Sequence, residues 1–203
     1  MIYGLSVSNV NLRHIHIAVP PTQTTTPGSE IIRHRYIRRT SASQLDIAVT
    51  DIDQTITDCL VDASFVEGLI IADSVLHEQL MSKKHLIATV DELGRGRRGV
   101  AMARWVAQQA DGLSESGGES KARALMIERG WQVPELQVEL PDPVEPGGVY
   151  RVDYLWRVGD RLIIGEFDGF IKSEKAAAEG KLAKAQFDER QRESRLSLFD
   201  NCK

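Results

Sequence analysis

The chain has 203 residues, of which 42% are hydrophobic and 27% are charged, the balance of an ordinary globular protein with one core or two small ones. Lysine and arginine total 25 against 29 for aspartate and glutamate, so the formal net charge of -4 excludes a protein that attracts nucleic acid through its overall charge. Dividing the chain after Gly112 leaves 11 basic and 12 acidic residues before the division and 14 and 17 after it, or -1 and -3. Any contact with phosphate must therefore be local.

Cysteine content and hydropathy bear on the cellular compartment. Cys59 and Cys202 are the two cysteines, and they lie far apart without the spacing of metal ligands. The longest apolar stretch, residues 65–76, contains two acids and is shorter than the ~20 residues that span a bilayer. We expect a cytoplasmic protein without a membrane-spanning segment.

The first third of the chain alternates in the manner of β-strands. Residues 14–19 and 31–37 are two such runs, separated by a stretch rich in proline, threonine and glycine, and an antiparallel pair with a long loop is expected. His14 and His16 lie on one face of the first strand, which is how a zinc site can begin. Because no cysteine is near and no third ligand is evident, a structural role is favoured.

Two basic clusters could supply local phosphate contacts. They are residues 33–39 and 95–98. The alternative is that they form a solvated strand edge and a solvated turn.

Residues 53–112 have the apolar period of helices. Ile56, Cys59, Leu60 and Ala63 share one face, Ser82 is placed to cap a helix ending at residue 93, and residues 99–110 form another. The acids of this region are Asp51, Asp53, Asp58 and Asp62. They could form a carboxylate cluster, but acids directly before a helical run are the usual composition of a helix start.

A short polar segment, residues 114–118, indicates a domain boundary, so we expect domains over residues 1–112 and 113–203. The second begins with a helix that Gly130 ends and is followed by strands and a long charged helix. The expected elements are a helix at 119–129, strands at 135–140, 149–156 and 161–167, and a helix at 174–198. The third strand is almost wholly apolar, which predicts a buried central strand. The predicted class is α/β, a mixed sheet flanked by helices after a smaller α+β domain.

Carboxylates follow the predicted strands of the second domain. Asp153 lies within one strand, Glu166 closes the next, and Asp168 is two residues further on the same face. A β-hairpin can bring the first two together, and burying carboxylates without partners is costly. Oxygen ligands of this kind suit Mg²⁺ or Mn²⁺ beside a phosphate. Glu119, on the preceding helix, and Lys172 are further candidates, or else a helix-start acid and a surface ammonium.

These motifs resemble a known family. The run from Glu119-Ser120 through Pro134-Glu135-Leu136-Gln137, then Arg151-Val152-Asp153-Tyr154-Leu155-Trp156, then Glu166-Phe167-Asp168-Gly169 is similar to the very-short-patch-repair-like (Vsr-like) branch of the PD-(D/E)XK nuclease superfamily. The resemblance covers about residues 113–195. It implies a restriction-endonuclease-like core and a magnesium-dependent endonuclease acting on DNA.

The resemblance also implies a role for each matching residue. Asp153 would be the main metal ligand and Glu166 the second. Glu119 would be an accessory acid borne by a helix, Gln137 a neighbour of the site, and Lys172 the cationic partner.

The front of the chain resembles the domain that precedes this nuclease module in AbiEi-type antitoxins of type IV toxin-antitoxin systems in actinobacteria. The residues concerned are Val49-Thr50 and Gln54 to Asp58. The resemblance implies a toxin-antitoxin partner as well as DNA.

The sequence also departs from the family pattern. The usual E-x-K motif reads E-x-D here, at residues 166–168. Compared with its relatives the chain lacks a leading winged helix and stops before a final strand, so we expect it to be shortened, notably at the carboxyl end. The alternative to a nuclease is therefore a catalytically weak or inactive nuclease fold that binds DNA or acts as an antitoxin-type regulator.

Overall fold

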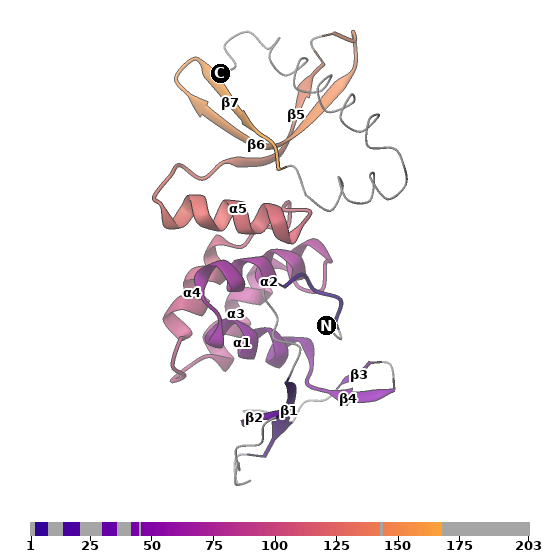
Figure 1. The fold of residues 1–203 in the computed structure, drawn as a ribbon, viewed down its shortest axis with the longest axis vertical. Helices are drawn as coiled ribbons and strands as arrows, with labels where there is room; N and C mark the ends of the chain where they lie inside the picture. Colours follow the sequence, from indigo (N-terminus) through magenta and orange to yellow (C-terminus); the bar gives the residue numbers. More distant parts are fainter. Residues whose placement is uncertain are drawn as a thin grey trace. The chain divides into compact units, whose positions relative to one another are not determined.

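The computed structural model describes residues 3–7, 14–20, 30–35, 42–44, 46–142 and 144–167, which form a mixed α/β structure. The chain divides into two compact units, Met1–Lys121 and Ala122–Lys203. Their elements are drawn in Figure 1. None of the described helices is long and apolar enough to cross a membrane.

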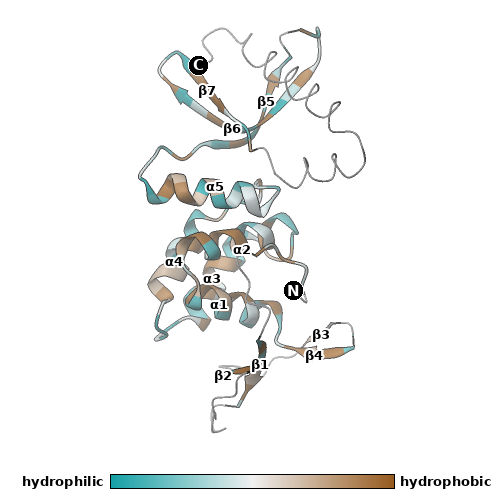
Figure 2. Ribbon diagram, viewed as in Figure 1, coloured by the Kyte–Doolittle hydropathy of each residue, from teal (hydrophilic) through white to brown (hydrophobic). Residues whose placement is uncertain are grey.

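Four helices form the core of the first unit. They are α1 (Ile52–Asp62), α2 (Phe65–His77), α3 (Lys83–Leu93) and α4 (Val100–Gln109). Each contributes buried apolar residues to a common core, and Figure 2 colours their ribbons by hydropathy. Ile56, Leu69, Leu86 and Val106 are each 0% exposed at the centre of this bundle. Each such side chain contributes about 1.5–3 kcal/mol through burial.

Local signals set the starts of the helices. The Asp51 carboxylate accepts a hydrogen bond from the backbone of Gln54 and caps α1, which confirms the helix-start interpretation of this acid. Ser64 and Glu67 form a capping box on α2. Ser82 caps α3, as the sequence predicts.

The strands of the first unit form two separate pairs. Strands β1 (Ile15–Val19) and β2 (Ile31–Arg35) are parallel, so the expectation of an antiparallel pair is wrong. The eleven residues between Val19 and Ile31 can reach about 36 Å when extended, more than the about 17 Å length of a five-residue strand, so the chain can return to its starting end. Strands β3 (Ala42–Gln44) and β4 (Ile47–Val49) form a hairpin that the sequence analysis did not predict.

Helix α5 (Gly117–Glu128) begins inside the segment that was expected to be a polar linker. Ser114 is only 3% exposed, and it accepts a hydrogen bond from the Ser120 hydroxyl. The division between the compact units falls after Lys121, nine residues beyond the predicted boundary at residue 112. Gly130 follows α5 with φ +69°, a conformation that suits the glycine expected to end this helix.

Strands β5 (Glu135–Pro141), β6 (Val149–Val158) and β7 (Arg161–Gly165) form an antiparallel sheet in the second unit. In the part of the sheet that the structure describes, β6 lies between the other two, so the prediction that the 161–167 strand is central is wrong. β6 is the longest strand and pairs along both edges, whereas β7 leaves Ile163 39% exposed. An apolar composition did not distinguish a central strand from a half-buried edge strand. The long helix expected at 174–198 lies outside the described residues.

Candidate functional site

The candidate site lies where β6 and the end of β7 run side by side. The last registered pair of these antiparallel strands joins Tyr154 to Gly165, and one further step of the same register would set Glu166 opposite Asp153. Directly opposed residues of an antiparallel pair have neighbouring side chains. Of the two acids that the sequence singled out, Asp153 lies in β6 and Glu166 follows the last residue of β7.

The carboxylate of Asp153 receives hydrogen bonds from both sides. The Gln137 side-chain amide donates to Oδ1 at 3.2 Å, and the backbone N–H of Phe167 donates to Oδ2 at 2.8 Å. One donor comes from β5 and the other from the residue after Glu166. These bonds fix the orientation of a half-buried carboxylate.

Gln137 adopts an unusual backbone conformation beside Asp153. Its φ of +50° falls in the left-handed region, which residues other than glycine rarely adopt. The registered pairs Leu136–Tyr154 and Val138–Val152 flank it, so it lies across from Asp153. The strand is irregular at the residue whose amide contacts the acid.

Glu166 stands at the border between the sheet core and solvent. Its Oε1 atom is buried, while the residue as a whole is half-buried. Two residues before it, Ile164 packs against the core cluster of Leu140, Val152 and Leu155. The packing of Ile164 therefore fixes the position of the strand end that carries Glu166.

Glu119 acts as a capping residue in the first unit. Its Oε2 accepts from the backbone N–H of Glu115 at 2.9 Å, its Oε1 accepts from the Ser116 hydroxyl at 2.7 Å, and its own N–H donates to Ser116. Ser116 thus caps the start of α5 through its hydroxyl, and the Glu119 carboxylate holds the same turn through the Ser116 hydroxyl and the backbone N–H of Glu115. Asp168 and Lys172, the remaining predicted site residues, lie outside the described residues.

The donor groups near Asp153 decide whether this site could hold a metal ion. Within the described ranges, no group of three or more histidine, cysteine, aspartate or glutamate side chains is arranged to hold a metal ion. Asp153 and Glu166 supply two acids, and the expected third, Asp168, falls beyond the described part of the chain. Carboxylate oxygens nevertheless match the preference of Mg²⁺ and Mn²⁺.

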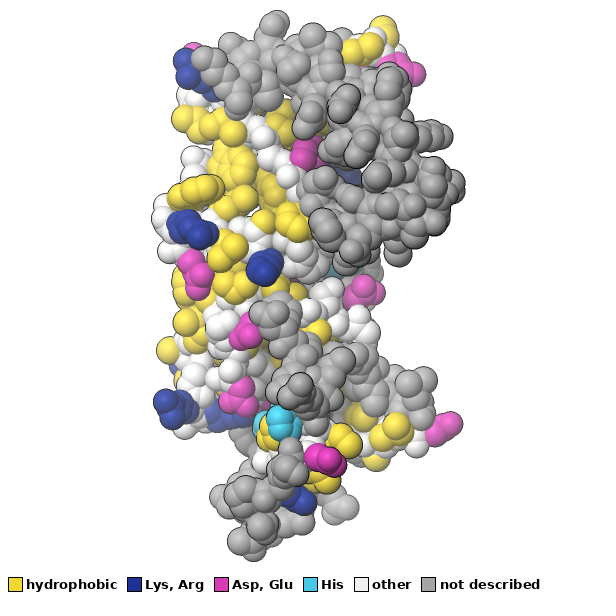
Figure 3. Space-filling model, viewed as in Figure 1, with side chains coloured by type: hydrophobic (Ala, Val, Ile, Leu, Met, Phe, Trp, Pro, Cys, Tyr) yellow, Lys and Arg dark blue, Asp and Glu magenta, His cyan; other side chains and the backbone are white. Residues whose placement is uncertain are grey.

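Two acids of the candidate cluster in the first unit have structural partners. Asp53 contacts Nε2 of His85 at 2.9 and 3.1 Å, and Asp58 pairs with Arg97. The second of these contacts commits one arginine of the 95–98 cluster to an ion pair. Figure 3 shows lysine and arginine side chains scattered over the face that it draws.

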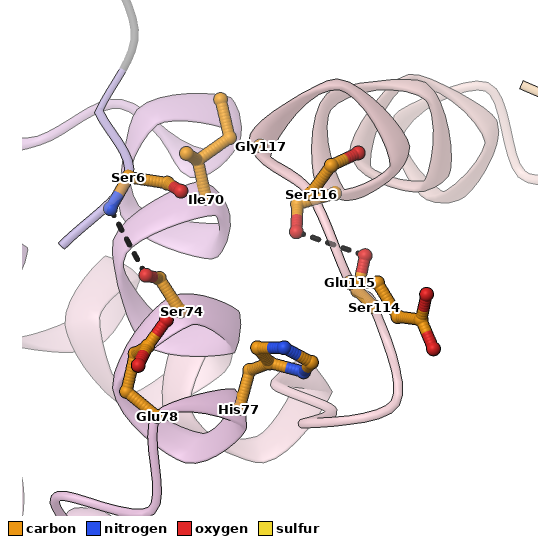
Figure 4. A pocket seen from close by; sticks show the side chains of 10 residues that line it. Ser6, Ile70, Ser74, His77, Glu78, Ser114, Glu115, Ser116 and Gly117 are labelled. Atoms are coloured by element: carbon orange, nitrogen blue, oxygen red, sulfur yellow. Dashed lines mark hydrogen bonds between the residues drawn. The ribbon is translucent and has the colours of Figure 1, made fainter. Parts of the chain in front are cut away.

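A small hollow near the start of α5 is drawn in Figure 4. Ser6, Ser74, His77 and Ser114 are among the side chains around it. Its volume of about 20 Å³ accommodates about one water molecule. A substrate does not fit there.

Sequence reasoning missed one histidine contact. Nδ1 of His16 and Nε2 of His34 lie 2.8 Å apart, although the two residues are 18 positions apart in the chain. The sequence analysis considered His14 and His16 on one strand and did not consider His34 on the other. In the observed parallel register His34 lies opposite Ala18, two residues after His16.

Comparisons with known proteins give a partial match. No family model and no solved structure matches the sequence. Relatives from two strains of Mycobacterium tuberculosis, both named as uncharacterized proteins, are each 39% identical to it over 84 residues. The match covers 41% of this chain, which thus spans 30% of the length of these curated relatives. Neither relative's name states an activity.

Proposed function

We propose that residues 113–203 form a metal-dependent, restriction-endonuclease-like module of a cytoplasmic protein that hydrolyses DNA phosphodiester bonds. The observation that supports it best is the Asp153 carboxylate, which is fixed by hydrogen bonds from the Gln137 amide and from the backbone N–H of Phe167, the residue after Glu166. Paired acids at the end of an apolar strand are the arrangement that metal-assisted phosphodiester hydrolysis needs.

Each residue has a proposed role. Asp153 and Glu166 would hold Mg²⁺ or Mn²⁺, an ion that polarises the phosphate and lowers the pKa of bound water when present. Gln137 orients Asp153 through its amide. On the sequence resemblance, Asp168 or Glu119 would position water, and Lys172 would offset developing negative charge.

A second candidate is a nuclease fold without cleavage that binds DNA or serves as an antitoxin-type regulator with a toxin partner. The E-x-D motif in place of E-x-K favours it. The contacts of Glu119 favour it too, because a carboxylate that caps α5 is engaged in holding a helix end. Both candidates share the sheet and differ in whether the acids perform chemistry.

Cleavage of supercoiled plasmid with Mn²⁺ separates the two candidates. We expect the wild-type chain to nick the plasmid, and Asp153→Asn to slow nicking by about two orders of magnitude or more, because it removes a ligand charge while keeping the side-chain shape. Asp160→Asn, an exposed aspartate in the turn after β6, is the matched control and should cleave like wild type.

Two results would contradict the nuclease proposal. Equal nicking by Asp153→Asn and wild type would place the activity elsewhere or in a contaminant. A folded wild-type chain that neither nicks DNA nor binds Mn²⁺ in calorimetric titration, yet retains DNA binding, would support the regulatory candidate.

A further inference from the structure

Three of the five histidines of the chain belong to the segment around β1 and β2. In the parallel register His16 lies opposite Ile32, and His34 lies opposite Ala18. Residues two apart in a strand share a face, so His16 and His34 are diagonal neighbours on one face of this pair. His14 directly precedes β1 and is two residues before His16, so the alternation of the strand gives both residues the same face.

The two imidazoles present ring nitrogens to each other. Nδ1 of His16 is 2.8 Å from Nε2 of His34, and the rings stack with centroids 5.0 Å apart and planes 15° from parallel. Such a hydrogen bond needs a proton on one nitrogen and a lone pair on the other. A metal ion can replace that proton and accept both lone pairs.

We propose that His16 Nδ1 and His34 Nε2 form a binding site for a divalent transition ion of the zinc class, with water at the remaining positions. Tetrahedral ligands at about 2.0–2.1 Å from zinc lie about 3.3 Å from each other, so the nitrogens need to separate by about 0.5 Å. Rotation of these surface side chains supplies that movement without a change in the strands. Imidazole favours Zn²⁺ and Ni²⁺, whereas carboxylates favour Mg²⁺ and Mn²⁺, so this site differs in chemistry from the one at Asp153.

The surroundings of His34 fit this role. Its other ring nitrogen, Nδ1, faces Oδ2 of Asp62 at 3.9 Å, at the last residue of α1. A carboxylate near the far nitrogen of a ligating histidine favours the tautomer whose Nε2 lone pair is available. His34 is also 31% exposed, so an ion can reach it from solvent.

Calorimetric titration of the full chain with ZnCl₂ alone, in buffer without Mg²⁺, tests the proposal. We expect one saturable site in the wild-type chain and a loss of affinity of at least about tenfold in both His16→Asn and His34→Asn. His85→Asn is the matched control, because His85 also lies beside a carboxylate, that of Asp53. It should bind zinc like wild type.

Imidazole nitrogen chemical shifts identify the ligating atoms. Zinc should move the ¹⁵N signals of His16 Nδ1 and His34 Nε2 and leave those of His85 in place. The absence of saturable binding, or equal affinity in wild type and both histidine variants, would overturn the proposal. Asp153→Asn should retain the zinc site, so this inference and the nuclease proposal fail or succeed separately.

Discussion

At the scale of single residues, the contacts of Asp153 give the candidate site its shape. The sequence could predict that the strands of residues 149–156 and 161–167 pair, because two alternating runs with a short turn between them form a hairpin, and the β6–β7 pairing confirms that step as far as Gly165. It could not predict that Phe167 would donate its backbone N–H to the carboxylate, since that depends on where β7 ends. Nor could it predict the left-handed backbone of Gln137, because glutamine has no preference for it.

Substitution of Gln137 tests whether this backbone conformation is strained. A left-handed residue with a side chain costs about 1–2 kcal/mol, and the amide hydrogen bond contributes about 0.5–1.5 kcal/mol. Gln137→Gly removes both terms, so we expect its free energy of unfolding in urea to stay within about 1 kcal/mol of wild type. Gln137→Val loses the bond and keeps a branched side chain at positive φ, so it should be less stable by about 1–3 kcal/mol. A valine variant as stable as wild type would argue against strain at this position.

At the scale of elements, helices were predicted better than strand partners. The apolar period and the capping residues of α1 to α4 are local, so Asp51 and Ser82 could be read directly from the sequence. Whether β1 and β2 run parallel depends on the path of the connection between them, which carries no local signal. The place of β7 at an edge depends on β6 being long enough to pair twice.

The junction between α1 and α4 offers a stability test. Gly99, at the start of α4, has φ +86°, and a Cβ added there would lie 2.0 Å from the carbonyl oxygen of Val61. Gly99→Ala should therefore lower the free energy of unfolding by about 2–4 kcal/mol, the sum of backbone strain and a steric clash.

Gly96 is the matched control for Gly99. It also has positive φ, at +75°, but an added Cβ there would meet nothing within 4 Å. Gly96→Ala should cost only about 1 kcal/mol in the same denaturation experiment. Equal losses for the two variants would show that the contact with Val61 is not the cause.

At the scale of the whole molecule, the net charge of -4 excluded binding to DNA through overall charge. Composition did not predict how the chain divides into units. The division after Lys121 could not be predicted, because small polar residues such as Ser114 and Gly117 are as common at a helix start as in a linker. Of the predicted site, Gln137 and Asp153 are joined by a hydrogen bond, Glu166 follows the end of β7, and Glu119 belongs to the other unit. Asp168 and Lys172 lie beyond the described residues and stay predictions.

Global stability should depend on pH through Cys59. Burial raises the pKa of its thiol from an ordinary 9.0 to about 11, with Asp58 and Asp62 acting in the same direction. A raised folded-state pKa stabilises the protein below the unfolded value, and that contribution is lost as pH rises through the folded value. The unfolding free energy of wild type should thus fall more steeply between pH 9 and 11 than that of Cys59→Ala, by at most about 1.4 kcal/mol per pH unit.

Denaturation curves at several pH values in a Cys202→Ser background check this expectation. The comparison concerns the slope against pH, so a constant offset from the smaller alanine side chain does not affect it. Parallel curves for the two proteins would contradict a raised thiol pKa at position 59.

The position of α5 has a practical consequence for anyone who expresses the two halves separately. A Cβ added at Gly117 would lie 3.3 Å from Cβ of Ser6 and 3.4 Å from Cγ2 of Ile70, so the first turn of the helix packs against the amino-terminal segment and α2. A fragment cut at residue 112 would lose that cover and leave part of α2 open to water. Overlapping fragments, each with a complete copy of α5, avoid cutting through a cooperative turn.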